Sequence, residues 1–155
     1  MDNTKQVIFK LGDQEFGIGI LYVKAIERYM DIVPVPNAPS FIEGIINLRG
    51  DVIPVYSLRS KFGLSKKSVD DETKLIVTKS KDIMMAFEVD SVNEIVEIAG
   101  SDIHEAPTII RTERTEYINY VADVNKRLVL LLNLDGILSE AEEGEIKKVA
   151  ESAQE

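Results

Sequence analysis

Cysteine is absent from this 155-residue sequence, and histidine occurs once, at His104. Without cysteine the chain has no disulfide, no thiol nucleophile and no cysteine-ligated metal site, which suits a reducing compartment. A single histidine with no second imidazole beside it completes neither a metal site nor a catalytic triad. We therefore expect no enzyme, no metal and no cofactor, and we interpret His104 as a loop residue.

Long apolar runs and a surplus of basic residues are also missing. No run approaches the roughly 18 apolar residues that a membrane-spanning helix needs, and the N-terminus lacks the basic start and apolar stretch of a signal peptide. Lysine and arginine number 18 against 27 acidic residues, a net charge of −9 that argues against nucleic acid or anionic lipid as a partner. Glycine-rich phosphate-binding motifs are lacking as well. We expect a cytoplasmic protein with no direct membrane insertion.

The apolar residues that are present alternate with polar ones and are interrupted about every ten residues by turn chemistry. This pattern is typical of a mainly β barrel or sandwich. Residues 7–11 and 15–20 predict a hairpin that turns at Gly12 and Asp13, and the prolines of residues 32–36 suit an extended edge strand. Further strands are predicted at residues 75–79, 83–90, 92–98, 118–124 and 128–134.

Helix is the minority state. One short helical turn is predicted from Ser57, as N-cap, to Gly63, and another is predicted to close at Gly44. Residues 139–155 open with capping-box spacing and predict a C-terminal amphipathic helix and tail. The polar segment 65–74 is expected to be a solvated loop that separates two similar sets of strands.

Several phrases then resemble a known family. They are "FKLGDQEFGIGI", "VPNAPSFIEGIINLRGDVIPVYSLR", "FEVDSVNEI" and "LVLLLNL". In their order and spacing they resemble CheW, the coupling protein family of bacterial chemotaxis, over about residues 7–138, and residues 44–59 are the most specific part. The same module occurs in CheV and in the histidine kinase CheA, but this chain shows no receiver or kinase segment, so a free-standing adaptor matches best.

The resemblance implies a fold of two intertwined five-stranded β-barrels with a shared hydrophobic core. We expect a CheW-like domain at residues 7–138, with the first barrel at about 14–72 and the second at about 73–138. The N-terminal strand is a candidate for exchange into the second barrel. Residues 139–155 form the expected C-terminal helix and tail.

The resemblance also implies a function without catalysis. Family members couple the cytoplasmic hairpin tip of transmembrane chemoreceptors to the regulatory domain of CheA and help to assemble signalling arrays at the inner face of the membrane. Other CheW copies in rings are a further candidate partner. Two alternatives stay open: a coupling protein of a non-chemotactic CheA-like pathway, in surface motility or second-messenger control, and a structural ring component that binds the kinase only.

Site residues follow from the resemblance position by position. The expected receptor-binding residues line a groove between the barrels: Val23, Ile26, Asn47, Leu48, Arg49, Val92 and Ile95. The expected kinase-binding residues are Val52, Ile53, Val55, Ile103, Ala106 and Pro107. About half of the apolar receptor-binding positions are expected to be buried in the free protein, since strand residues at this spacing are more often core than interface.

Arg49 lies in apolar surroundings and needs water or a partner. Its guanidinium is expected to meet either a receptor group or a carboxylate within this chain. The acidic rim residue of the family is replaced here by Ala25, with Glu27 displaced toward the next face, so the carboxylate that Arg49 meets stays open. The chain also departs from the family at Tyr120, where glycine is usual, and at Ser57, where aspartate is usual.

Overall fold

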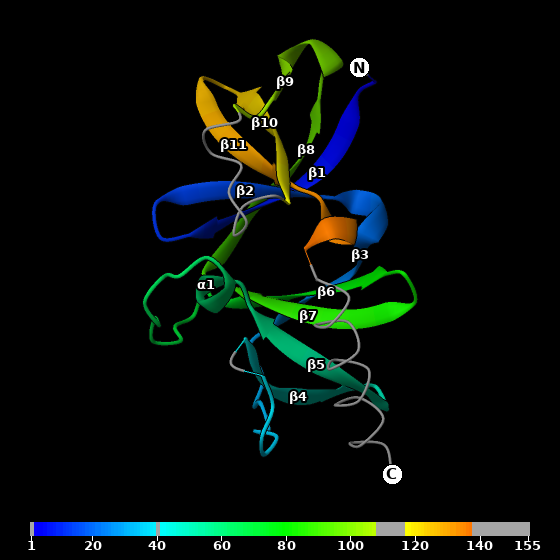
Figure 1. Ribbon diagram of the computed structural model, residues 1–155, viewed down its shortest axis with the longest axis vertical. Coiled ribbons are helices and arrows are strands. Elements are labelled where there is room, and N and C mark those ends of the chain that lie inside the picture. The colour runs from blue at the N-terminus through cyan, green and yellow to red at the C-terminus, as the bar shows by residue number, and fades with distance from the viewer. Residues whose placement is uncertain (1, 40, 108–116, 138–155) are drawn as a thin grey trace.

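The computed structural model describes residues 2–39, 41–107 and 117–137. Within these residues the protein consists of two β-sheets with several short helical turns between strands (Figure 1). No helix among them is long and apolar enough to cross a membrane. The mainly β fold predicted from the alternating pattern is confirmed.

The elements follow one another along the chain as β1 (Thr4–Leu11), β2 (Gln14–Gly19), η1 (Ile20–Tyr22), β3 (Val23–Arg28), β4 (Ile42–Leu48), β5 (Asp51–Ser57), α1 (Leu58–Lys61), β6 (Lys74–Ser80), β7 (Ile83–Val89), β8 (Ser91–Ile98), η2 (Gly100–Asp102), β9 (Ile103–Glu105), β10 (Ile118–Val124), β11 (Arg127–Leu132) and η4 (Leu134–Gly136). The η elements are single turns of 3₁₀-helix.

Sheet A has the strand order β8-β1-β2-β11-β10-β9, and sheet B has the order β3-β6-β7-β5-β4. Figure 1 shows sheet A in the upper part of the view and most of sheet B in the lower part. Sheet B has the expected five strands, whereas sheet A has six. The additional strand is the short β9, which pairs with β10 and carries an exposed His104 opposite Val121, so this histidine is not the loop residue that we expected.

The sheets do not divide at the polar segment 65–74. Sheet B contains strands from both sides of that segment, because β5 pairs in parallel with β7, and a parallel pair needs a crossover connection. Sheet A in turn takes β1 and β2 from the N-terminus and pairs β2 in parallel with β11. The two N-terminal strands, β1 and β2, therefore lie in the same sheet as the later strands β8 to β11.

Three clusters of buried apolar side chains stabilise the two sheets. One lies within sheet A and includes Ile8 and Val129, one lies within sheet B and includes Ile46 and Val77, and the largest joins both sheets. The largest cluster contains an aromatic stack in which Phe62, just after α1, contacts the rings of Phe16 at 5.1 Å and Tyr117 at 5.3 Å between centroids. Each such ring pair contributes roughly 0.5–1.5 kcal/mol beyond its area burial, so the stack fixes α1 against sheet A.

The predicted turn chemistry is correct at α1 and wrong at Gly44. Ser57 Oγ accepts a hydrogen bond from the Ser60 N–H at 3.1 Å, and Gly63 ends the turn with φ +75°. Gly44 closes no helical coil but lies inside β4, where a Cβ would stand 2.3 Å from the carbonyl oxygen of Val33. That close approach arises because Val33 forms a β-bridge with Ile45. The predicted C-terminal helix lies outside the described residues.

Candidate functional site

Arg49 occupies the tip of the hairpin between β4 and β5. Arg49 and Gly50 have φ of +52° and +92°, the left-handed pair that a two-residue hairpin turn requires. The Asn47 side-chain oxygen accepts a hydrogen bond from the Gly50 N–H at 3.1 Å and fastens the turn. The Arg49 side chain is 74% exposed, so the turn directs its guanidinium out of the apolar surroundings.

The carboxylate that Arg49 meets is Glu27. The Nη2 of Arg49 donates a hydrogen bond to Oε1 of Glu27 at 3.1 Å, and the Glu27 side chain is 20% exposed. Glu27 lies on β3, and β3 and β4 are the two outer strands of sheet B. The ion pair therefore bridges opposite edges of a sheet that curls around its own core. An exposed pair of this kind contributes only about 0.2–1 kcal/mol, so its main effect is to orient the guanidinium.

The expected receptor-binding residues lie on strands of both sheets. Ile26 on β3 is 37% exposed and Ile95 on β8 is 52% exposed, which is unusual for isoleucine side chains in a folded protein. Val23 and Val92 are half-buried against the cluster that joins the sheets, so β3 and β8 both border that cluster. Leu48 is half-buried against the core of sheet B, and Asn47 is exposed.

The expected kinase-binding residues are mostly interior. Ile53 is 1% exposed, Val55 is fully buried, and Ile103 and Ala106 are 9% and 4% exposed. Val52 is half-buried and Pro107 is exposed, so these two alone of the set offer surface in the free chain. Residues 53–56 form a continuous buried run because β5 is covered on both faces. The consecutive apolar residues of "VIPVY" are typical of such a strand.

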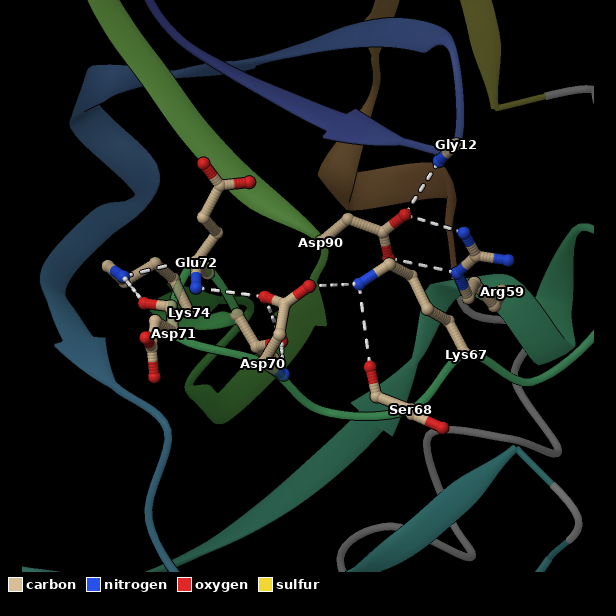
Figure 2. Close-up of polar contacts among 10 residues, drawn as sticks. Gly12, Arg59, Lys67, Ser68, Asp70, Asp71, Glu72, Lys74 and Asp90 are labelled. Atoms are coloured by element: carbon tan, nitrogen blue, oxygen red, sulfur yellow. Dashed lines mark hydrogen bonds and ion pairs between the residues drawn. The ribbon is translucent and has the colours of Figure 1, made fainter.

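The sequence analysis missed a set of polar contacts around Asp90 that connects the two sheets, which we call the Asp90 bracket (Figure 2). Asp90 stands between β7 of sheet B and β8 of sheet A. Its carboxylate accepts hydrogen bonds from Nε and Nη2 of Arg59 at 2.9 and 2.5 Å and from the Gly12 N–H at 2.7 Å. Burial raises the pKa of Asp90, but the hydrogen bonds from Arg59 and Gly12 outweigh it and hold that pKa below its usual value. The bracket thus ties the β1–β2 turn to α1.

A second bracket is centred on Asp135 in η4. Its carboxylate accepts hydrogen bonds from the Ser80 hydroxyl at 2.5 Å and the Tyr22 hydroxyl at 2.8 Å. These two hydrogen bonds lower the pKa of Asp135, and the bond from Ser80 has the larger effect. Ser80 ends β6 of sheet B, and Asp135 follows the last strand of sheet A, so this contact also fixes one sheet relative to the other. Both brackets help to position β3 and β8, which carry Ile26 and Ile95.

A pair of carboxyl groups lies in a cleft of about 400 Å³ over sheet B. Glu43 and Glu88 both line it, with Tyr29, Arg59 and Lys67 among its other residues. Burial, followed by the hydrogen bond and charge of Glu43, raises the pKa of Glu88 to about 8. The pair therefore holds a proton at neutral pH. In the part of the chain that the structure describes, no three histidine, aspartate or glutamate side chains gather to form a metal site.

The chain is similar to known proteins in sequence and in fold. The CheW-like domain family matches residues 5–142 of the chain. "Chemotaxis protein CheW" of Klebsiella aerogenes is 34% identical over 146 residues, covering 94% of this chain and 88% of that protein. "Protein FrzA" of Myxococcus xanthus is 27% identical over 134 residues, covering 86% of this chain and 84% of that protein. The crystal structure of the scaffolding protein TtCheW from Thermoanaerobacter tengcongensis has a TM-score of 0.79 at 27% identity and covers 90% of both chains.

The agreement extends over nearly the whole chain and over both sheets. The motifs around Arg49, Arg59 and Asp90 are among those in which the sequence resembles the family, and the structure gives Arg59 and Asp90 a shared role between the sheets. The chain belongs to the CheW family of non-enzymatic coupling and scaffold proteins.

Proposed function

We propose that this protein is a cytoplasmic chemotaxis adaptor that couples the hairpin tips of transmembrane chemoreceptors to the histidine kinase CheA. Through these contacts it is recruited to receptor arrays at the inner face of the membrane and helps to assemble them. The observation that supports this most is the exposure of Ile26 and Ile95 on strands of two different sheets.

A helix-in-groove contact needs apolar anchors and a few polar groups that set orientation. Ile26 and Ile95 supply the anchors, and Val23 and Val92 form a floor with the cluster that joins the sheets. Glu27 holds one N–H of Arg49, and the guanidinium has further N–H groups for a carboxylate or carbonyl on the receptor helix. Arg49 thus acts as an oriented donor at the rim.

On the kinase side we propose a contact of barrel against barrel with the CheA regulatory domain. Val52 and Pro107 present the surface, and the buried Ile53, Val55, Ile103 and Ala106 shape the strands beneath it. Each interface is expected to be modest, because contacts repeated through an array gain strength from multivalency.

The match to "Protein FrzA" favours a second candidate, a coupling protein for a CheA-like pathway outside chemotaxis. This candidate keeps the same surfaces and changes only the receptor and kinase. A ring component that binds kinase and no receptor is a third candidate, for which Ile26 and Ile95 would be dispensable.

The test uses three proteins: wild type, Ile95→Ser, and Leu128→Ser as a matched control. Leu128 is also an exposed apolar residue of sheet A, 63% exposed on β11, outside the proposed surfaces. Binding to a receptor cytoplasmic hairpin and to the CheA regulatory domain is measured separately. We expect Ile95→Ser alone to weaken receptor binding, by about 5- to 10-fold, with kinase binding and thermal stability unchanged. Equal receptor affinities for all three proteins would contradict the proposal.

A further inference from the structure

The apolar residues of the proposed receptor groove have the same spacing on both sheets. On β3 they are Val23 and Ile26, and on β8 they are Val92 and Ile95. Successive side chains of a regular strand point to opposite faces, so two residues separated by two others lie on opposite faces. A regular β3 or β8 would therefore present only one residue of each pair to the groove.

A β-bulge brings the pair on β8 to one face. Val92 pairs with Phe9 of β1, Ile95 pairs with Val7, and both partners belong to the cluster that joins the sheets. Residues that pair directly across two strands share a face. The register shifts between these two pairs, and Asn93 is the residue that has no partner on β1. This extra residue reverses the alternation, so Val92 and Ile95 face the same side.

The strand β3 contains the same device. Its register with β6 shifts at Lys24, so that Val23 pairs with Thr78 and Ile26 pairs with Ile76. Ile76 belongs to the cluster that joins the sheets, and Val23 packs against that cluster. Two bulges, one on an outer strand of each sheet, thus direct an apolar pair toward the same cluster.

The bulge at Asn93 lies beside an ion pair. β8 is an outer strand of sheet A and pairs within that sheet with β1 alone. Glu94 follows the bulge and pairs with Ile8, so its side chain turns toward the interior of sheet A. There its carboxylate accepts a hydrogen bond from Nη2 of Arg127 at 2.5 Å. Because a bulge interrupts the ladder of an edge strand, this contact from β11 fixes β8 next to Ile95.

Arg127 is itself held by two other strands. Its Nη1 donates to Oε1 of Glu15 on β2 at 3.2 Å, and its Nε donates to the carbonyl oxygen of Val124 on β10 at 3.3 Å. The Glu15 side chain is 11% exposed and the Glu94 side chain 36%. The guanidinium is therefore oriented by the inner strands of sheet A and has one nitrogen directed at β8. On β3 the residue after the bulge is Ala25, which carries no charge.

We propose that Arg127 is a positioning residue of the receptor groove, because through Glu94 it holds the bulge at Asn93 and with it the direction of Val92 and Ile95. The inference rests on the proposed function, since it takes Ile95 as a receptor contact. Arg127 touches no receptor in this arrangement. Without the ion pair, β8 can shift toward regular alternation, in which Val92 and Ile95 no longer face the groove together.

The test combines receptor binding with amide hydrogen exchange of the free chain. The variants are Glu94→Ala, Arg127→Met and the double variant, and Glu15→Ala is the matched control, because it removes the other ion pair of the same arginine. We expect Glu94→Ala and Arg127→Met each to weaken binding to a receptor cytoplasmic hairpin about three- to fivefold. Exchange of the β8 amides that bond to β1 is expected to rise in both, with CheA binding unchanged.

Two comparisons separate positioning from general stability. The double variant is expected to bind no more weakly than Arg127→Met, because Arg127 acts through Glu94. Glu15→Ala is expected to lower the melting temperature more than Glu94→Ala, since its carboxylate is the more buried, and yet to keep wild-type receptor affinity. Additive losses in the double variant, or a loss of receptor affinity in Glu15→Ala equal to that in Glu94→Ala, would overturn the proposal. If Glu15→Ala does not fold, the double variant decides.

The substitution Ile95→Ser in the same assay distinguishes this inference from the adaptor proposal. Receptor affinity unchanged in Ile95→Ser contradicts the groove itself. Weakened binding in Ile95→Ser together with unchanged β8 exchange and unchanged affinity in Arg127→Met contradicts only the positioning role. The exchange measurement uses no receptor, so it tests the hold of Arg127 on the bulge even if the groove is wrong.

Discussion

The Nη2 of Arg49 lies 3.1 Å from Oε1 of Glu27, which joins the β4–β5 turn to β3 across the two edges of sheet B. The arginine remains 74% exposed while it makes this contact. A charge that is held in place yet still faces solvent adds little to folding stability and is well suited to recognition.

Glu27→Gln should therefore affect binding more than folding. Loss of the carboxylate charge releases the guanidinium, while the exposed pair contributes less than about 1 kcal/mol to the free energy of unfolding. Urea denaturation and receptor titration of this variant check both parts. A stability loss well above 1 kcal/mol would show that the pair mainly supports the fold.

Asp90→Asn should destabilise the protein by about 2 kcal/mol, because it leaves the Arg59 guanidinium partly buried beside a neutral amide. Asp70→Asn is the matched control, since Asp70 forms an exposed ion pair with Lys67 in the same region (Figure 2). The control should stay near wild type in urea denaturation. Equal effects of the two substitutions would rule out a special role for the Asp90 bracket.

Stability should fall as the pH rises from about 5 to 8. The pKa of Glu88 is raised from 4.5 to about 8 by burial and by Glu43, so between these values the folded state binds more protons than the unfolded state. Solvent screening at a half-exposed carboxyl keeps the change to the order of 1–2 kcal/mol. Asp90 and Asp135 have lowered pKa values, so their contributions are present above pH ~4 and are lost only in more acidic solution.

The measurement is urea denaturation at several pH values between 5 and 8, on wild type and Glu88→Gln. The variant should lose most of the pH dependence and should be the more stable protein at pH 8, because the amide carries no charge to bury. A wild-type stability that is level or rises across this range would contradict the assignment.

Ser57→Ala should cost about 1 kcal/mol, because it removes the acceptor of the Ser60 N–H at the start of α1. Ser57→Asp, the residue usual in the family, should retain the cap. Ser60→Ala, at an exposed serine within the same turn, is the control for the loss of a hydroxyl. Thermal denaturation of the three variants separates a capping role from a general sensitivity of this segment.

Strand existence and local turns could be predicted from the sequence because they depend on neighbouring residues. The β1–β2 hairpin, the strands after residue 74 and the Ser57 cap all follow from alternation and turn chemistry. Gly44 misled us because its backbone freedom serves close contact with Val33, a residue on another segment, and no local pattern records that approach.

Strand order and burial on a second face could not be predicted in the same way. The alternation of apolar and polar residues shows which side chains of a strand share a face, but not which strand pairs with it. The parallel pairs β5–β7 and β2–β11 were therefore missed. Ile53 and Val55, two of the expected kinase-binding residues, are buried in the core that sheet B encloses, which alternation alone does not indicate. The partner of Arg49 stayed open in the sequence for the same reason, since Glu27 becomes a neighbour only when sheet B curls.

The most direct test of the adaptor proposal is the binding of wild type and Arg49→Ala to a receptor cytoplasmic hairpin and, separately, to the CheA regulatory domain, with a thermal melt of each protein. The account predicts at least about tenfold weaker receptor binding for Arg49→Ala, with kinase binding and the melt unchanged, because the side chain is exposed and oriented. Unchanged receptor affinity, or a lowered melt with both affinities weakened, would contradict it and make Arg49 a residue of the fold.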